Sequence, residues 1–265
     1  MAADNLSLSG KVVIVTGSGR ENGIGAAIAF ALARNGASVA INYVSDSSAS
    51  RAAQVAAKVE SFGAKAIVIQ ANVSTPEGAA KLVRETLEGF KTDRIDILVN
   101  NAGSGVGQGK LLLDLTPAEV QKAFALNTFS TLYPIQAAAP HMPRGGRIVN
   151  IGTVVSKITN LPGVSVYGAS KAAQDYLTAA LSTELGSRHG ITVNTVAPGP
   201  TAETDANTWF PDGELKAEVG TKLSAGAKLG RVAGEVEEVA DAVLLLVSEQ
   251  ARWITGQFVA ASGGI

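Results

Sequence analysis

Residues 12–25 are Val12-Val13-Ile14-Val15-Thr16-Gly17-Ser18-Gly19-Arg20-Glu21-Asn22-Gly23-Ile24-Gly25, four β-branched residues followed by a glycine-rich turn. An unbroken apolar run of this kind is typical of a parallel strand covered on both faces. Ile24, Ile28 and Leu32 then recur every four residues, which predicts a helix ending at Asn35-Gly36. Strand, glycine-rich turn and helix in this order open dinucleotide-binding α/β sheets.

The same alternation of β-rich runs and Ala-rich helical patterns continues along the chain, as expected when crossover helices join parallel strands. Further strands are expected at residues 38–43, 66–70, 95–99, 147–151, 191–196 and 257–260. Further helices are expected at 47–62, from 76, from near 120 and from 167 to about 188. No linker, repeat or low-complexity block divides this order, so we expect one catalytic domain over residues 1–265.

Local signals refine these helices. Thr75-Pro76 has the pattern of an N-cap followed by an N1 proline, and Thr116 and Glu119 have the spacing of a capping box. Pro134 is expected to disturb the helix in which it lies. The predicted fold class is therefore α/β, a doubly wound Rossmann-type domain with a seven-stranded parallel sheet. Residues about 200–230 are expected to form an insert that covers substrate at the carboxyl edge, where ligands bind.

Composition excludes several kinds of function. The 265 residues contain 22 basic and 23 acidic side chains, so no strong field favours nucleic acid or an anionic membrane. Cysteine is absent and the two histidines, His141 and His189, are far apart, so we expect no disulfide and no metal site. No long apolar run or signal-peptide pattern is seen, which makes a soluble cytoplasmic protein the expectation.

The glycine-rich turn predicts a phosphate-binding site. Gly17, Gly23 and Gly25 would let the backbone approach a pyrophosphate, and the N–H groups at the start of the helix, from Ile24, would face it. The alternative is that these glycines only allow the helix and the strand to pack closely.

The end of the second strand indicates which dinucleotide binds. An NAD site usually has Asp or Glu there, whereas this chain has Asn42-Tyr43-Val44-Ser45. Arg20, Ser45 and Ser47 could instead donate hydrogen bonds to a 2′-phosphate, which favours NADPH over NADH. Alternatively, Arg20 is solvated and the serines cap the next helix.

Tyr167-Gly168-Ala169-Ser170-Lys171 places a phenol and an ammonium one helical turn apart. A neighbouring ammonium favours the phenolate, so the spacing predicts an acid/base tyrosine with a lowered pKa. By itself the same spacing also occurs by chance on helix surfaces.

Taken together, the motifs resemble those of the short-chain dehydrogenase/reductase family, in its Tyr-x-x-x-Lys branch. The resemblance extends from Gly10 to Gly264. In chain order, it rests on Thr16-Gly17, Gly23-Ile24-Gly25, Asn100-Asn101-Ala102-Gly103, Asn127, Tyr167, Lys171 and Pro198-Gly199. Within the family, the chain is most similar to NADPH-dependent ketone reductases such as fungal naphthol reductases and 3-oxoacyl carrier-protein reductases.

The resemblance implies four catalytic roles. Tyr167 would protonate the carbonyl oxygen, and Lys171 would lower the tyrosine pKa and hold the nicotinamide ribose. Asn127 would hold a water that links Lys171 to solvent; otherwise it is a satisfied mid-helix polar residue. Thr153 stands where the family has a catalytic serine, with Ser156 as a second candidate and a purely strand-capping Thr153 as the alternative.

The resemblance also adds cofactor contacts and two departures. The further contacts expected are Asn72, Val73, Asn101, Ala102, Gly103, Pro198 and Gly199. Asn72 stands where the family commonly has Asp. Glu21 and Asn22 lengthen the glycine-rich turn by two residues, as in enoyl reductases of this fold. Those enzymes have a wider Tyr–Lys spacing, so carbonyl reduction is expected here.

The substrate is expected to contact Ser104, Val154, Trp209 and Phe210. Two adjacent aromatic residues in the insert suggest an apolar lid over a cyclic or aromatic ketone, although they could equally pack the insert onto the body.

Three functions remain as hypotheses. The first is an NADPH-dependent ketone reductase; the second is a fold relative that catalyses a non-redox cyclisation, isomerisation or elimination; the third is a dinucleotide-binding regulator without turnover. A homotetramer is expected by resemblance, through the helices around residues 120–139 and 172–185. Arg144 and Arg188 raise the possibility of an acidic carrier-protein partner.

Overall fold

Seven parallel strands form the centre of the part of the chain that this computed structural model describes, residues 6–202, 210–231 and 233–265. Their order in the sheet is β3-β2-β1-β4-β5-β6-β7, and every neighbouring pair is parallel. The strands are β1 Val12–Val15, β2 Ser38–Tyr43, β3 Ala66–Gln70, β4 Ile97–Asn100, β5 Arg147–Ile151, β6 Thr192–Pro198 and β7 Phe258–Ala261. The expected fold class is confirmed.

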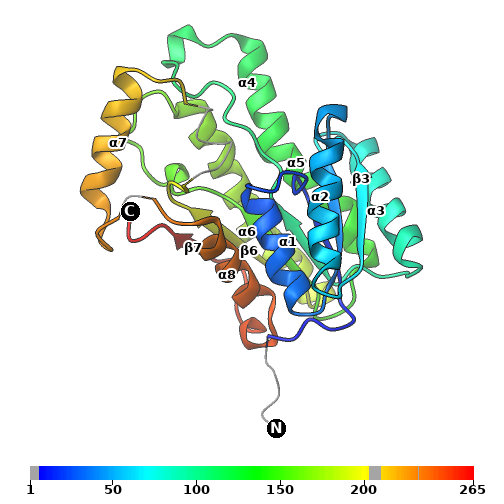
Figure 1. The fold of residues 1–265 in the computed structure, drawn as a ribbon. Coiled ribbons are helices and arrows are strands. Elements are labelled where there is room, and N and C mark those ends of the chain that lie inside the picture. Colours follow the sequence, from blue (N-terminus) through cyan, green and yellow to red (C-terminus); the bar gives the residue numbers. More distant parts are fainter. Residues whose placement is uncertain (1–5, 203–209, 232) are drawn as a thin grey trace.

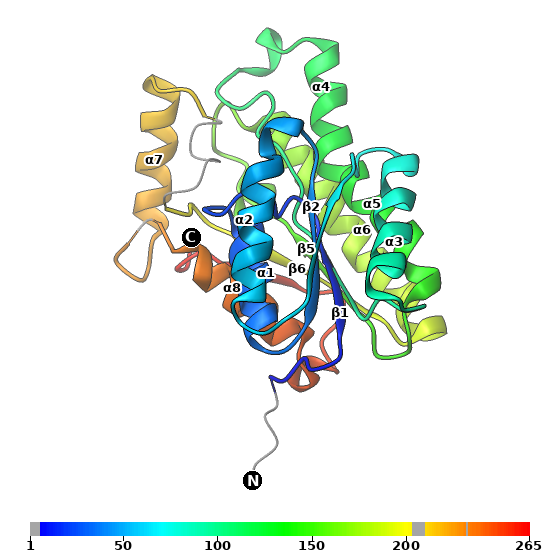
Figure 2. The ribbon, with the colours of Figure 1, turned by 45° about the vertical axis from the view of Figure 1, so that its right-hand side comes forward.

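Helices cover both faces of the sheet, as Figures 1 and 2 show. One layer consists of α1 Ile24–Arg34, α2 Ala49–Glu60 and α8 Val236–Val247, and the other of α3 Pro76–Phe90, α5 Ser130–Ala138 and α6 Ser165–His189. Successive strand residues enter opposite layers: Val13 and Val15 pack toward α1 and α8, whereas Ile14 packs toward α3 and α5. This two-sided burial explains the unbroken apolar run of β1.

Most boundaries agree with the sequence pattern, and the differences have local causes. β4, β6 and β7 each begin one or two residues later than expected. Ile95 is buried, but its N–H donates to the His141 carbonyl rather than to a strand. α2 begins at Ala49 because residues 46–48 form a short 3-10 turn. The N-cap at Thr75 and the capping box of Thr116 and Glu119 are both present.

The disturbance expected at Pro134 is wrong in its position. α4 Pro117–Phe124 leads into a five-residue π turn, Ala125–Phe129, and α5 then continues through Pro134. The wide turn contains Asn127, whose side chain bonds to Ser104 and Ser170 outside the helix. The helix geometry therefore changes at the hydrogen bonds that Asn127 makes with other elements, and not at Pro134, which lacks a backbone N–H.

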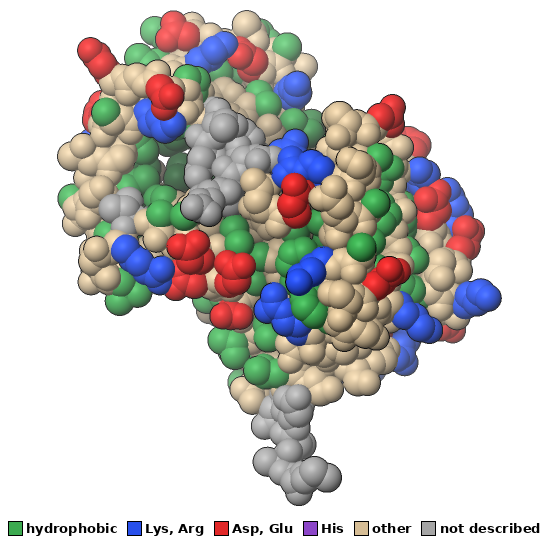
Figure 3. All heavy atoms as spheres, in the orientation of Figure 1, with side chains coloured by type: hydrophobic (Ala, Val, Ile, Leu, Met, Phe, Trp, Pro, Cys, Tyr) green, Lys and Arg blue, Asp and Glu red, His purple; other side chains and the backbone are tan. Residues whose placement is uncertain are grey.

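The described part of the 200–230 segment includes α7 Glu214–Gly226, which stands beside the carboxyl edge of the sheet (Figure 1). Val219 and Leu223 of α7 pack with Phe210, Leu161 and Val164 in a small separate cluster. None of the helices in the described ranges is long and apolar enough to cross a membrane. On the face in Figure 3, Lys and Arg side chains are interspersed with Asp and Glu.

Candidate active site

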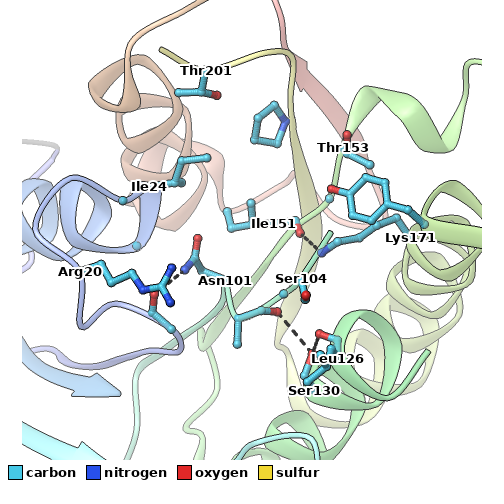
Figure 4. Close-up of a pocket in the computed structure, with 18 of the residues that line it drawn as sticks. Arg20, Ile24, Asn101, Ser104, Leu126, Ser130, Ile151, Thr153, Lys171 and Thr201 are labelled. Atoms are coloured by element: carbon cyan, nitrogen blue, oxygen red, sulfur yellow. Dashed lines mark hydrogen bonds between the residues drawn. The ribbon is translucent and has the colours of Figure 1, made fainter. Parts of the chain in front are cut away.

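A cavity of about 680 Å³ opens where the carboxyl ends of the strands meet. Arg20 and Ile24 lie on one side of it, and Thr153 and Lys171 on the opposite side (Figure 4). In the parallel sheet, residues that are distant in sequence reach the same edge, since each strand ends there. The cavity thus joins the expected phosphate-binding turn to the expected catalytic residues.

Most of the predicted site residues line this cavity. They are Gly17, Arg20, Gly23, Ile24, Gly25, Asn72, Val73, Asn101, Ala102, Gly103, Ser104, Thr153, Val154, Tyr167, Lys171, Pro198, Gly199 and Phe210. Ser45 and Ser47 are not among the lining residues. Asn127 does not line the cavity either, because it is fully buried. Trp209 lies outside the described residues.

The glycines of the turn serve close packing. An ideal Cβ at Gly17 would lie 2.9 Å from the Ala102 Cα, and one at Gly25 would lie 2.5 Å from the Asn101 Nδ2. Gly17 also has a φ of +63°, which disfavours other residues. The packing interpretation therefore holds for these two positions, and the same glycines keep side chains out of this wall of the cavity.

The first turn of α1 has the features of an anion site. Its N-cap is Gly23, so no side chain caps the helix, and no acidic residue lies in the first turn. Among the described lining residues, the charged ones are Arg20, Lys171 and Lys216, with no Asp or Glu. A dinucleotide carries its negative charge on the phosphates, so the donors and the charge present fit such a ligand.

The two additional turn residues are tied to α2. The Arg51 Nε donates to the Glu21 Oε2 at 2.7 Å, and its guanidinium also donates to the Asn22 Oδ1 at 2.8 Å. Arg51 was not predicted from the sequence, because its partners lie about thirty positions earlier in the chain. The lengthened turn is thereby fixed against the start of α2.

At the end of β2, the hydroxyl of Ser45 bonds to those of Ser47 and Ser48, at 2.9 and 3.1 Å. Neither Ser45 nor Ser48, the N-caps of the 3-10 turn and of α2, makes a side-chain cap hydrogen bond. Ser48, which was not predicted from the sequence, lines the cavity. The contacts proposed for Ser45 and Ser47 stay predictions.

Tyr167 is half-buried in the cavity wall, at the start of α6. Burial raises its pKa to about 12, and a hydrogen bond with the Thr153 hydroxyl partly opposes this rise. This corrects the expectation that Lys171 lowers the tyrosine pKa, because desolvation of the phenolate dominates. At neutral pH the phenol keeps its proton and can donate it.

Lys171 is held by two acceptors beneath the cavity. Its Nζ donates to the Ile151 carbonyl at 2.8 Å, as Figure 4 shows, and to the Gln174 Oε1 at 2.9 Å. Burial lowers the pKa of Lys171 to about 8, and the charge of Asp175 partly restores it. Because an ammonium has three N–H donors, one of them remains available to a ligand.

Gln174 and Asp175 are further buried polar residues that sequence reasoning missed. With Lys171 and Thr178 they recur at the i, i+3, i+4 and i+7 positions of α6, all on its buried side. Polar residues at positions where an amphipathic helix normally has apolar ones were the signal that could have revealed them.

Thr153 is buried beside the tyrosine, directly after β5. Its Oγ1 accepts a hydrogen bond from the Val155 N–H at 3.3 Å, which leaves its O–H to donate. Ser156, the second candidate for this role, is not a lining residue, and its hydroxyl bonds to Asp175 at 2.6 Å. Thr153 is thus the better placed of the two.

Asn127 is fully buried and joins three elements. Its Oδ1 accepts from the Ser104 N–H at 2.8 Å, and its Nδ2 donates to the Ser104 carbonyl and to the Ser170 hydroxyl. Asn127 therefore fixes the loop after β4 against α6. The water proposed beside it stays a prediction.

No group of three or more metal-ligating side chains occurs among the residues described.

The parallel sheet is covered by helices on both faces, and its glycine-rich turn and the Tyr167–Lys171 pair line the same cavity. This combination defines a dinucleotide-dependent oxidoreductase. A family model described as enoyl-(acyl carrier protein) reductase matches residues 17–265. Versicolorin reductase 1 of Aspergillus parasiticus is 38% identical over 269 residues, which cover 99% of this chain and 98% of that protein. The chain belongs to the short-chain dehydrogenase/reductase family.

Two solved structures have the same fold along nearly their whole length. A short-chain dehydrogenase from Burkholderia cenocepacia in complex with NADP is 39% identical, with a TM-score of 0.85 and coverage of 97% of this chain and 98% of that one. The angucycline C-6 ketoreductase LanV with bound NADP is 38% identical, also with a TM-score of 0.85, and the coverage is 97% and 96%.

Proposed function

We propose that this oxidoreductase uses NADPH to reduce the carbonyl group of a cyclic or aromatic ketone, with Tyr167 as the general acid. The observation that carries the proposal is the arrangement of the cavity: Tyr167, Thr153 and Lys171 line one end of it, and the glycine-rich turn with Arg20 lines the other (Figure 4). The domain comprises residues 1–265, with about 200–230 as the substrate-covering segment.

The cofactor proposal is supported by the acid-free cavity wall and by the NADP complexes of the two similar structures. Arg20 would hold the 2′-phosphate and the glycine-rich turn the pyrophosphate, and Lys171 would donate its remaining N–H to the nicotinamide ribose. When bound, the reduced nicotinamide supplies the hydride.

The chain's own residues would handle the proton. Tyr167 donates its proton to the carbonyl oxygen as that oxygen gains negative charge, and the Thr153 hydroxyl donates a second hydrogen bond to it. Lys171 holds the ribose. Together with Asn127, which lies behind it, Lys171 also forms the route by which a proton from solvent reaches Tyr167 and replaces the one that was donated. The neutral phenol suits this direction of reaction, since a phenolate has no proton to give.

The ketone class is supported by the walls around the tyrosine. Val154, Val155, Val164, Phe210 and Leu223 line this part of the cavity, and they present mainly apolar surface. Such walls favour flat, apolar rings whose polar carbonyl reaches the hydroxyls of Tyr167 and Thr153. The similar proteins include a versicolorin reductase and an angucycline C-6 ketoreductase, and the second of these names supports reduction of a ketone.

The proposal is tested by following NADPH absorbance with a panel of bicyclic and aromatic ketones, and with matched enones. Consumption with ketones and formation of the alcohol would support it. Consumption only with enones would favour alkene reduction, which the description of the matching family model suggests as the second candidate. Substrate loss at constant absorbance would indicate the non-redox alternative, and binding without any conversion the regulator.

Arg20→Ala is expected to weaken NADPH binding by at least about tenfold and to leave NADH binding almost unchanged, because one charge-assisted phosphate contact contributes roughly 1.5 to 3 kcal/mol. Titration of the two cofactors, followed by nicotinamide fluorescence, measures both constants. An equal loss for NADPH and NADH would mean that Arg20 only shapes the turn.

The pH dependence of kcat/KM should follow Lys171. Its ammonium is present below pH 8 and is lost as the pH rises through a pKa of about 8, so kcat/KM should fall above that pH. Tyr167, with a pKa of about 12, keeps its proton over the same range and cannot cause the fall. A constant kcat/KM from about pH 7 to 10 would contradict the role of the ammonium.

We also propose a homotetramer that forms through the helices around residues 120–139 and 172–185, where Phe129 and Tyr176 are exposed. A large exposed aromatic on each helix fits a self-complementary interface. Light scattering at micromolar concentration should give four times the chain mass of 27.0 kDa. A monomer would contradict this assembly. An acidic carrier protein that contacts Arg144 and Arg188 is a weaker proposal.

A further inference from the structure

Asp175 is a buried carboxylate for which the proposed reaction has so far no role. It lies one helical turn beyond Lys171 on α6, and only 7% of the residue is exposed. A buried carboxylate costs free energy unless its partners compensate, and a well-packed apolar side chain would often be at least as stable. Its partners therefore indicate its role.

The partners of Asp175 belong to the turn that follows Thr153. Its Oδ2 accepts from the Ser156 hydroxyl at 2.6 Å and lies 3.5 Å from the Lys157 Nζ. The same ammonium lies 5.0 Å from the centre of the Phe258 ring in β7. The carboxylate thus holds the far end of the turn Val154–Ser156.

The carboxylate also adjoins the chain just before Thr153. An ideal Cβ at Gly152 would lie 3.2 Å from the Asp175 Oδ1, an atom that has no hydrogen-bond partner among the described residues. Asp175 therefore lies close to the backbone on one side of Thr153 and is bonded to the side chain of Ser156 on the other.

We propose that Asp175 is a positioning residue, which through Ser156 holds the turn that presents the Thr153 hydroxyl to Tyr167 and the substrate carbonyl. The proposal rests on the proposed function, because it gives Thr153 a part in the reaction.

The connection runs through a few short contacts. The Ser156 hydroxyl gives its single proton to the carboxylate, and the backbone N–H of Ser156 donates to the Thr153 carbonyl at 3.3 Å, so Ser156 links the carboxylate to the backbone of Thr153. α6 carries Tyr167 and Asp175 on one helix, whereas Thr153 lies on a separate turn. Anchoring that turn to α6 fixes the distance between the two hydroxyls, and catalysis is sensitive to shifts of about 1 Å.

A double-mutant cycle tests this route. Thr153→Val is expected to lower kcat by about 10²-fold, as for the loss of one donor to a developing oxyanion. Ser156→Ala and Asp175→Asn should each lower kcat by about tenfold while the NADPH dissociation constant stays within about twofold. In the Thr153→Val background, either change should cost less than about twofold, because the hydroxyl that they position is already gone.

Equal losses in the two backgrounds would overturn the proposal, since Asp175 would then act on Lys171 or on the fold as a whole. Asp96→Asn is the matched control. Asp96 is also buried, accepts from the Val12 N–H at 2.9 Å and pairs with Lys11, but it lies at the amino edge of the sheet. We expect Asp96→Asn to lower the melting temperature without lowering kcat; an equal effect of both variants on kcat would also overturn the proposal.

Failure of the proposed function would look different. If Tyr167→Phe turns over at the wild-type rate, Tyr167 is not the general acid and the proposed function is wrong. If Tyr167→Phe is inactive but Thr153→Val keeps the wild-type rate, the reduction stands and only the positioning role of Asp175 is overturned.

Discussion

Tyr167→Phe is expected to lower kcat by about 10²- to 10⁴-fold and to change the NADPH dissociation constant by less than about twofold. The variant keeps the ring in the cavity wall and removes only the proton donor. Because burial holds the tyrosine pKa at about 12, the wild-type phenol is protonated throughout the working range, and its loss should be felt at every pH from 6 to about 9.

The control for this variant is Tyr176→Phe. Tyr176 is on the same helix but does not line the cavity, and phenylalanine keeps the ring that the proposed interface would bury, so removal of its hydroxyl should leave kcat unchanged. Turnover is measured with a ketone from the substrate panel, and cofactor binding by nicotinamide fluorescence. If Tyr167→Phe turns over at the wild-type rate, the proton comes from another group.

Lys171→Ala is expected to damage both binding and turnover. NADPH should bind about tenfold more weakly, and kcat/KM should fall by at least about 10³-fold, since the contact with the ribose and the proton route would both be lost. The Ile151 carbonyl and the Gln174 amide oxygen would also lose their donor beneath the cavity. The melting temperature should therefore be measured beside the kinetics.

Lys65→Ala, at an exposed position just before β3 and outside the proposed interface, is the matched control and should change neither quantity. A Lys171→Ala variant that loses kcat but binds NADPH normally would contradict the contact with the ribose. It would leave Lys171 with a role in proton transfer alone.

Much of the fold could be predicted because burial on both faces leaves a clear pattern in the sequence. β1, β2, β3 and β5 have the expected bounds, and their neighbours in the sheet follow from the crossover helices. The break before α5 could not be located, because the side chain of Asn127 in the π turn forms its hydrogen bonds with residues about 20 and 40 positions away. Pro134 was the stronger local signal and was misleading.

Site residues that belong to a sequence motif could be predicted, whereas residues that are recognised only by their contacts in space could not. The turn from Gly17 and the Tyr167–Lys171 pair meet in one cavity because parallel strands end at the same edge. Gln174, Asp175 and Arg51 were missed since each is defined by its partners in space. The direction of the tyrosine pKa was also missed, because spacing along a helix does not reveal burial.

Transfer of deuterium from NADPH that carries deuterium at both hydrogen positions of the nicotinamide C4 tests the central claim most directly. The wild-type enzyme would be incubated with the labelled cofactor and a cyclic ketone that also contains a conjugated double bond. We predict that the deuterium appears on the carbon that bears the new hydroxyl group, with one label for each NADPH consumed. Deuterium on a carbon of the former double bond, or a product without label, would contradict carbonyl reduction by this site.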